Sequence, residues 1–187
     1  MSFVYLLVII NIDVNNSQIT HQDLQFSTLL FFVLGLAALL PLVFVFDDAA
    51  FRQTSFQIGL SSALFWFILA GFALIFFWDI YYRYIFPAWV RWFMTLNIFL
   101  YTGIGLVMWW VAIQLPGPSI LIFVILGGIE GVIEHIYGIS FLRILQKVPW
   151  LKGLNPTQVL IFSFFEYVFY WSLVAWVAYL LPRLGIL

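Results

Sequence analysis

The stretch that decides the fold runs from Phe26 to Phe46 and reads FSTLLFFVLGLAALLPLVFVF. It contains no Asp, Glu, Lys or Arg. A helix needs about 20 predominantly apolar residues to cross the hydrocarbon core of a bilayer, which is about 30 Å thick. The stretch therefore predicts a membrane-spanning helix.

The composition of the whole chain supports the same class of protein. Hydrophobic residues make up 65% of the 187 residues and charged residues only 8%, whereas about 25% of the residues in a soluble domain are charged. The apolar residues form long runs, without the short segments of alternating polarity that mark a transmembrane barrel. Helices satisfy their own backbone hydrogen bonds in lipid. The sequence therefore predicts an all-α, polytopic transmembrane bundle, a multi-pass integral membrane protein.

Five spans with short loops account for the chain. The Pro116-Gly117-Pro118 turn separates the third span from the fourth. The predicted spans are Phe26–Phe46, Phe56–Tyr82, Ala88–Leu115, Ser119–Leu145 and Gln158–Leu181. Residues 1–25 are expected to form an N-terminal interfacial and loop segment, because Met1–Ile12 is too short to span and the next residues are polar. Residues 26–187 then form a single five-helix transmembrane domain.

The basic residues predict the orientation of the bundle. Five spans place five of the seven basic residues on one side of the membrane and two on the other. The first group is Arg83, Arg91, Arg143, Lys147 and Lys152, and the second is Arg52 and Arg183. Because basic loops remain on the cytoplasmic side, we expect the N-terminus in the cytoplasm and the C-terminus outside.

The fourth span contains the polar residues that matter for function. Residues 127–138 read GGIEGVIEHIYG. Adjacent residues of a helix lie about 100° apart, so Glu130 and Glu134 share one stripe and Gly127 and Gly131 lie beside it. The isoleucines collect on the opposite side, which we expect to face lipid. The carboxylates are therefore expected to point into the bundle, where small residues admit a neighbouring helix.

Polar residues of three spans are expected to share one layer of the membrane. With a rise of 1.5 Å per residue, Glu134 and His135 lie roughly 6–8 Å from Glu130, which is near the middle of its span. Glu166 and Asn97 lie roughly 5 and 7 Å from the midpoints of their own spans, towards the same side. The site predicted from these positions consists of Glu130, Glu134, His135 and Glu166, supported by Asn97, Tyr101 and Tyr170.

The charge balance of this layer predicts its chemistry. Every Lys and Arg lies near the end of a span or in a loop, so no basic side chain neutralises the three glutamates. An ionised acid in the bilayer is costly. The acids can be protonated, share protons with His135, line a water-filled cavity or bind a cation. Our first hypothesis is a site that handles protons or a cation, in a protein that acts alone or as a small subunit of a larger membrane complex.

Three other interpretations remain open. The same four residues, Glu130, Glu134, His135 and Glu166, are a donor set for iron, manganese or zinc, as in a membrane metalloenzyme of oxidoreductase type. Against a di-iron centre, Glu134 and His135 are adjacent, whereas di-iron bundles use Glu-x-x-His pairs. An aromatic pocket for a quinone or a lipophilic amine is a second alternative. A purely structural subunit, with protonated acids bonded across helices, is the third.

Several other classes of cofactor and partner are disfavoured. The chain has no cysteine, which excludes iron–sulfur clusters, and its two histidines are too few for intrachain bis-histidine haem in the membrane. There is no basic stripe for nucleic acid. No hydrolase or nucleotide-binding motif is present, so the sequence assigns no enzyme class. The expected partners are the lipid bilayer and either other membrane subunits or further copies of the chain.

Overall fold

The computed structural model of the chain describes residues 21–45, 47–52, 60–61, 63–64, 88–140 and 155–185. Within residues 21–27, 50, 88–99 and 138–140 it describes the backbone only. Every regular element in these ranges is helical, and the described residues contain no strand. The predicted span at Phe56–Tyr82 lies outside the described residues except for 60–61 and 63–64, which are helical, and the segment Met1–Ile12 lies entirely outside them.

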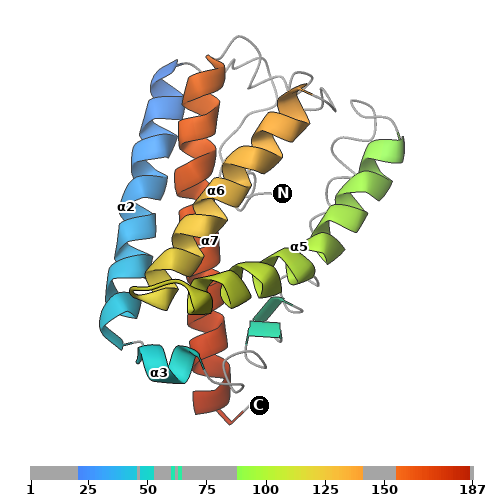
Figure 1. Cartoon of the computed structure of the whole chain (residues 1–187). Helices are drawn as coiled ribbons and strands as arrows, with labels where there is room; N and C mark the ends of the chain where they lie inside the picture. The colour runs from blue at the N-terminus through green and yellow to red at the C-terminus, as the bar shows by residue number, and fades with distance from the viewer. Residues whose placement is uncertain are drawn as a thin grey trace.

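Four long helices and one short helix form the described architecture. They are α2 (His21–Val45), α3 (Asp48–Phe51), α5 (Ala88–Gln114), α6 (Ser119–Ser140) and α7 (Pro156–Arg183). Helix α7 packs mainly against α6 and α2, and α5 packs mainly against α6. Figure 1 shows α2, α6 and α7 side by side, while the N-terminal part of α5 diverges from them.

The helix boundaries follow local signals in the sequence. Helix α7 begins after Asn155, whose side chain accepts a hydrogen bond from the Thr157 amide at 2.9 Å, with Pro156 in the first turn. Gly117 has a positive φ of 114° in the turn between α5 and α6, a conformation that glycine adopts without strain. In the described residues α2 extends from His21, five residues before the predicted span, and no proline or glycine interrupts His21–Gln25. The predicted loop therefore ends earlier than we expected.

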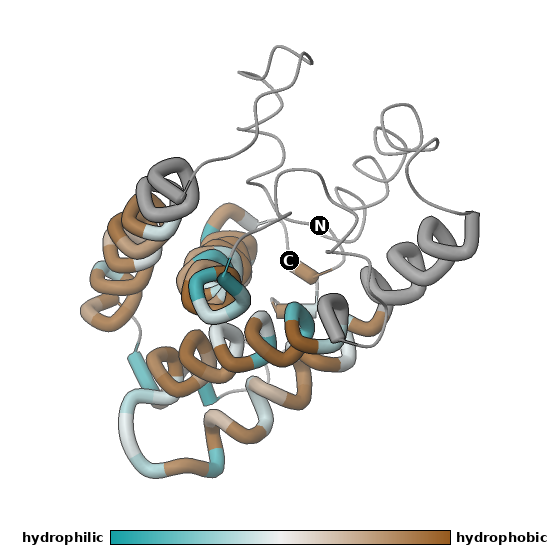
Figure 2. Tube along the Cα trace, turned by 90° about the horizontal axis from the view of Figure 1, so that it is seen from above, coloured by the Kyte–Doolittle hydropathy of each residue, from teal (hydrophilic) through white to brown (hydrophobic). Residues whose placement is uncertain are grey.

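Three helices are long and apolar enough to cross a membrane. The segments are Thr28–Val45 in α2, Ser119–Tyr137 in α6 and Pro156–Arg183 in α7, with a shorter apolar segment at Leu100–Gln114 in α5. Figure 2 shows that apolar residues predominate along these helices, with polar residues interspersed. Their length and composition are those of helices that cross a membrane. On α6, Ile125, Ile129, Ile133 and Ile136 are exposed, on the side predicted to face lipid.

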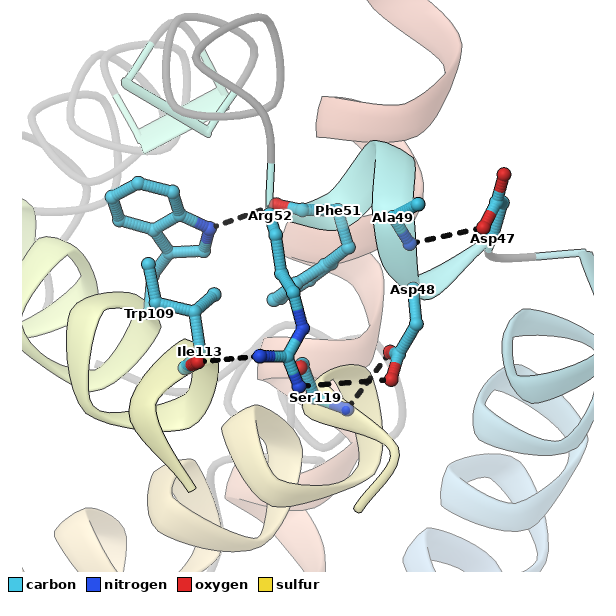
Figure 3. Close-up of polar contacts among 8 residues, drawn as sticks. All are labelled: Asp47, Asp48, Ala49, Phe51, Arg52, Trp109, Ile113 and Ser119. Carbon is cyan, nitrogen blue, oxygen red and sulfur yellow. Dashed lines mark hydrogen bonds and ion pairs between the residues drawn. The ribbon is translucent and has the colours of Figure 1, made fainter. Parts of the chain in front are cut away.

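Residues in and next to α3 form hydrogen bonds with the chain on both sides of the turn between α5 and α6 (Figure 3). The Asp48 carboxylate accepts a hydrogen bond from the Ser119 amide at 3.0 Å, at the N-terminus of α6. Arg52 lies 3.9 Å from Asp48 and donates to the Ile113 carbonyl at 2.7 Å, near the C-terminus of α5. The indole of Trp109 donates to the Phe51 carbonyl at 3.2 Å. Each charge of the pair thus lies at the helix end whose dipole it complements.

The contact between α6 and α7 depends on glycines that face large aromatic side chains. A Cβ atom on Gly127 would overlap the first side-chain atoms of Trp171, and one on Gly131 would overlap those of Tyr167. Trp171 is fully buried and Tyr167 is 6% exposed. Because the overlap falls at the base of each side chain, a change of rotamer at its far end does not relieve it. The glycine stripe is therefore a packing surface, as predicted.

We expect Gly127→Ala to lower the free energy of unfolding by about 1–3 kcal/mol, the usual cost of overpacking a core. Gly103→Ala is the matched control, because a Cβ on this exposed helical glycine meets no atom within 4 Å. The control should be neutral or stabilising by up to about 1 kcal/mol. Reversible unfolding in mixed detergent micelles measures both variants. Equal stability of the two would contradict this account of the α6–α7 contact.

Candidate functional site

The candidate site is built on two successive Gly-x-x-Glu units of α6, Gly127–Glu130 and Gly131–Glu134. Trp171 and Tyr167 of α7 are also four residues apart, and each packs on the glycine of one unit. Each aromatic group then donates a hydrogen bond to the glutamate of the same unit. The two units therefore repeat one arrangement at successive turns of α6.

In the first unit, the indole of Trp171 donates to Glu130 Oε2 at 3.4 Å. An indole N–H can donate a hydrogen bond but cannot accept one. This contact can therefore hold the carboxylate of Glu130 in place, but it cannot pass a proton onward.

In the second unit, Glu134 Oε2 accepts hydrogen bonds from two phenols that belong to different helices. Tyr101 of α5 donates at 2.5 Å, and Tyr167 of α7 also donates to this oxygen. The two phenol oxygens lie 3.0 Å apart. We call Tyr101, Glu134 and Tyr167 the phenol–carboxylate triad. It joins α5, α6 and α7 through three oxygens in mutual contact.

The number of hydrogen atoms in the triad decides what it can do chemically. Each phenol has one hydrogen and can both donate and accept. With Glu134 ionised, both phenols donate to the carboxylate, and the contact between the phenols has no hydrogen. With Glu134 protonated, three hydrogens serve three contacts, and a closed ring forms in which each group donates once and accepts once. The triad can therefore hold Glu134 with or without a proton.

His135 and Tyr170 flank the triad. His135 Nδ1 lies 3.0 Å from the Gly131 carbonyl oxygen, which can only accept, so this nitrogen is the donor. Its ring meets the Tyr167 ring edge-on, with centroids 5.9 Å apart. The Tyr170 ring lies 6.1 Å from that of Tyr101 and 6.0 Å from that of Tyr167. Both residues thus enclose the phenols.

The three glutamates of the predicted site differ in burial. Glu166 is buried, with 4% of its surface exposed, whereas Glu130 and Glu134 are half-buried. Of the three glutamates expected to point into the bundle, only Glu166 is buried in the described residues. For Glu130 the reason is geometric: it directly precedes Gly131, so it is turned about 100° away from the surface on which Tyr167 packs.

The four predicted metal ligands are not assembled into a metal centre. Within the described part of the chain, no group of three or more His, Cys, Asp or Glu side chains is placed to hold a metal ion. Asn97 belongs to α5, but its side chain lies outside the described residues.

Sequence reasoning missed Tyr167 and Trp171. The chain contains nine tyrosines and nine tryptophans, and neither residue type stands out in an apolar helix. The signal that could have identified them is a shared spacing. Two glycines of α6 lie four residues apart, and two bulky aromatic residues of α7 are separated by the same number of residues.

Comparison with known proteins adds no family to this description. No protein-family model matches the chain, and no match was found among curated proteins or solved structures.

A double-mutant cycle tests the triad. We expect Tyr167→Phe and Glu134→Ala to be coupled by about 1–2 kcal/mol in the free energy of unfolding, within the range of hydrogen bonds to charged groups and between membrane helices. The control cycle pairs Glu134→Ala with Tyr179→Phe, because the Tyr179 ring lies against Trp176 and Arg183. The control coupling should be near zero. Similar coupling in both cycles would argue against the triad.

Proposed function

We propose that Glu134 is a reversible proton-binding site within the membrane and that the chain handles protons, either alone or as a small subunit of a larger membrane complex. The observation that carries the proposal is the convergence of two phenols, from α5 and α7, on one carboxylate oxygen of α6. Ionisable residues inside membrane segments generally mark ion or proton routes.

The phenols of Tyr101 and Tyr167 can stabilise an ionised Glu134 in place of a basic side chain. An ionised carboxylate in an apolar region needs a counter-charge or several hydrogen-bond donors. Tyr101 and Tyr167 are two such donors, and the same hydroxyls accept once Glu134 is protonated. Neither state leaves the Oε2 atom of Glu134 without a hydrogen-bond partner. This favours a group that gains and loses a proton over one that is fixed in a single state.

The roles of the predicted site residues then differ. Glu134 binds the proton, and Tyr101 and Tyr167 stabilise both of its states. Glu130 is held by a group that cannot relay a proton, so its role is positional. His135 carries its hydrogen on Nδ1, which leaves Nε2 as the basic nitrogen. An imidazole of this kind can accept a proton from Glu134 or return one to it. Tyr170 encloses the phenols.

The proposal includes a bundle of five spans, with α2, α5, α6 and α7 joined by a helix at Phe56–Tyr82. It places the N-terminus in the cytoplasm. The contact between Arg52 and the Ile113 carbonyl supports this arrangement, because it puts Arg52 beside the turn at 115–118. Figure 1 places the C-terminal end of α7 at the same end of the molecule as α3. The two basic residues assigned to the outer side, Arg52 and Arg183, thus lie at one end.

Proton binding is tested by titration of the purified protein in detergent with a pH indicator. We expect Glu134→Gln to bind about one proton fewer per chain than the wild type, since the amide does not titrate. Glu130→Gln is the matched control, because it makes the same substitution one turn away and keeps an acceptor for Trp171. It should retain the proton-binding step of Glu134. A Glu134→Gln titration identical to that of the wild type would refute the proposal.

Proton flux in liposomes and particle mass separate a protein that acts alone from a subunit. Flux that Glu134→Gln removes would indicate that the chain acts alone. A particle far heavier than 21.8 kDa plus its detergent, after mild extraction from the native membrane, would indicate a subunit.

The topology is tested by single-cysteine labelling, since the chain has no cysteine of its own. We expect Leu115→Cys to react with an impermeant maleimide added to intact cells, and Thr157→Cys to react only after permeabilisation. Both residues are exposed at helix ends. The reverse pattern would invert the proposed orientation, and labelling of both from one side would contradict the passage of α6 across the membrane.

A further inference from the structure

We infer that Gly131 is a positioning residue of the proton-binding site. Because it has no side chain, Tyr167 can reach Glu134, and this contact sets how tightly Glu134 holds its proton. The inference rests on the proposed function and deepens it by naming a residue on which the proton affinity depends. Gly131 has no group that binds a proton, so it acts only through Tyr167.

The contact between Gly131 and Tyr167 lies at the base of the tyrosine side chain. A Cβ atom on Gly131 would lie 2.6 Å from both Cβ and Cδ2 of Tyr167, whereas unstrained contacts between carbon atoms begin at about 3.5 Å. Alanine at this position would therefore push Tyr167 back by roughly 1 Å. The Cβ atom of Tyr167 is bonded directly to the backbone of α7, so no change of rotamer absorbs this displacement.

The displacement withdraws one of the two phenols from Glu134. Tyr167 is only 6% exposed, and its ring meets the rings of His135 and Tyr170 at 5.9 and 6.0 Å, so it has little room to tilt back towards α6. Hydrogen bonds between oxygens span about 2.5–3.0 Å, and a retreat of this size brings the Tyr167 hydroxyl to the edge of that range or beyond it. Tyr101 approaches from α5 and keeps its own bond to Glu134.

Withdrawal of Tyr167 affects the two states of Glu134 unequally. A hydrogen bond donated to a carboxylate favours its ionised form, and bonds to charged groups are about twice as strong as those between neutral groups. The ionised state therefore loses more than the protonated state. We expect Gly131→Ala to hold its proton more tightly than the wild type, by roughly three- to tenfold. The glycine thus allows Glu134 to release its proton more readily.

The neighbouring groups provide matched controls. Alanine at 131 still supplies the backbone carbonyl that accepts a hydrogen bond from His135 Nδ1, so the substitution leaves this bond in place. A Cβ atom on Gly127 would overlap Trp171 to a similar extent, but Trp171 donates to Glu130 and not to Glu134. Gly127→Ala therefore loosens the same pair of helices without withdrawing a donor of Glu134.

Infrared spectroscopy of the protein in liposomes tests the inference by following the carboxylic C=O band of Glu134 against pH. The band is assigned by its loss in Glu134→Gln. We expect the midpoint of the titration to move to higher pH in Gly131→Ala, by the three- to tenfold given above, and by less than about twofold in Gly127→Ala. Tyr167→Phe should give a shift as large as that of Gly131→Ala. Adding Gly131→Ala to Tyr167→Phe should change the midpoint little further, because the phenol is already absent.

The positioning role is overturned if Gly131→Ala titrates like the wild type, or if it gives the same shift in the Tyr167→Phe background as in the wild type. An equal shift in Gly127→Ala would also overturn it, because general loosening of the helix pair would then explain the effect. Each of these results leaves proton binding at Glu134 intact. A wild-type band that does not change with pH would instead overturn the proposed function, and the positioning role with it.

Two measurements do not require Gly131→Ala to fold. Tyr167→Phe keeps the packing on Gly131, and an unshifted midpoint in this variant would overturn the inference. Solid-state NMR of the wild type in lipid should show a correlation between Gly131 Cα and Tyr167 Cβ. Its absence would show that the two residues are not in contact and would overturn the inference as well.

Discussion

The structure depends on how closely α6 and α7 approach at Gly127 and Gly131. Without side chains at these positions, the rings of Trp171 and Tyr167 lie directly on the backbone of α6. Van der Waals packing of this kind is a main source of helix association in lipid, because the hydrophobic effect does not distinguish a neighbouring helix from a lipid chain. The same approach brings the polar edge of each ring within reach of the glutamate three residues later. The close approach of α6 and α7 therefore accounts both for the packing of the two helices and for the hydrogen bonds that Glu130 and Glu134 accept from α7.

The two Gly-x-x-Glu units share this geometry and differ in chemistry because their aromatic partners differ. An indole holds Glu130 by donation alone, whereas a phenol at Glu134 can donate and accept. A second phenol, from α5, closes the triad. Removing a proton from Glu134 leaves the contact between the phenols of Tyr101 and Tyr167 without a hydrogen, so the protonation state alters the bonding between α5 and α7. Such a link can connect proton binding to a change in helix packing.

Much of the fold could be predicted from the sequence, because local signals set it. Proline and glycine mark the turn at 115–118 and the start of α7, while no such residue marks the start of α2, whose boundary was predicted too late. The inward stripe of Glu134 follows from helical periodicity. The partners of this stripe could not be predicted, because one sequence does not fix the register between helices. Tyr167 and Trp171 were missed for that reason.

The central claim is that two phenols meet one carboxylate between α5, α6 and α7. Solid-state NMR of the protein in lipid, with ¹³C labels at tyrosine Cζ and glutamate Cδ, measures this directly. The account predicts correlations from Glu134 Cδ to two tyrosine Cζ atoms, one lost in Tyr101→Phe and the other in Tyr167→Phe. A Glu134 signal without a correlation to either tyrosine would contradict it.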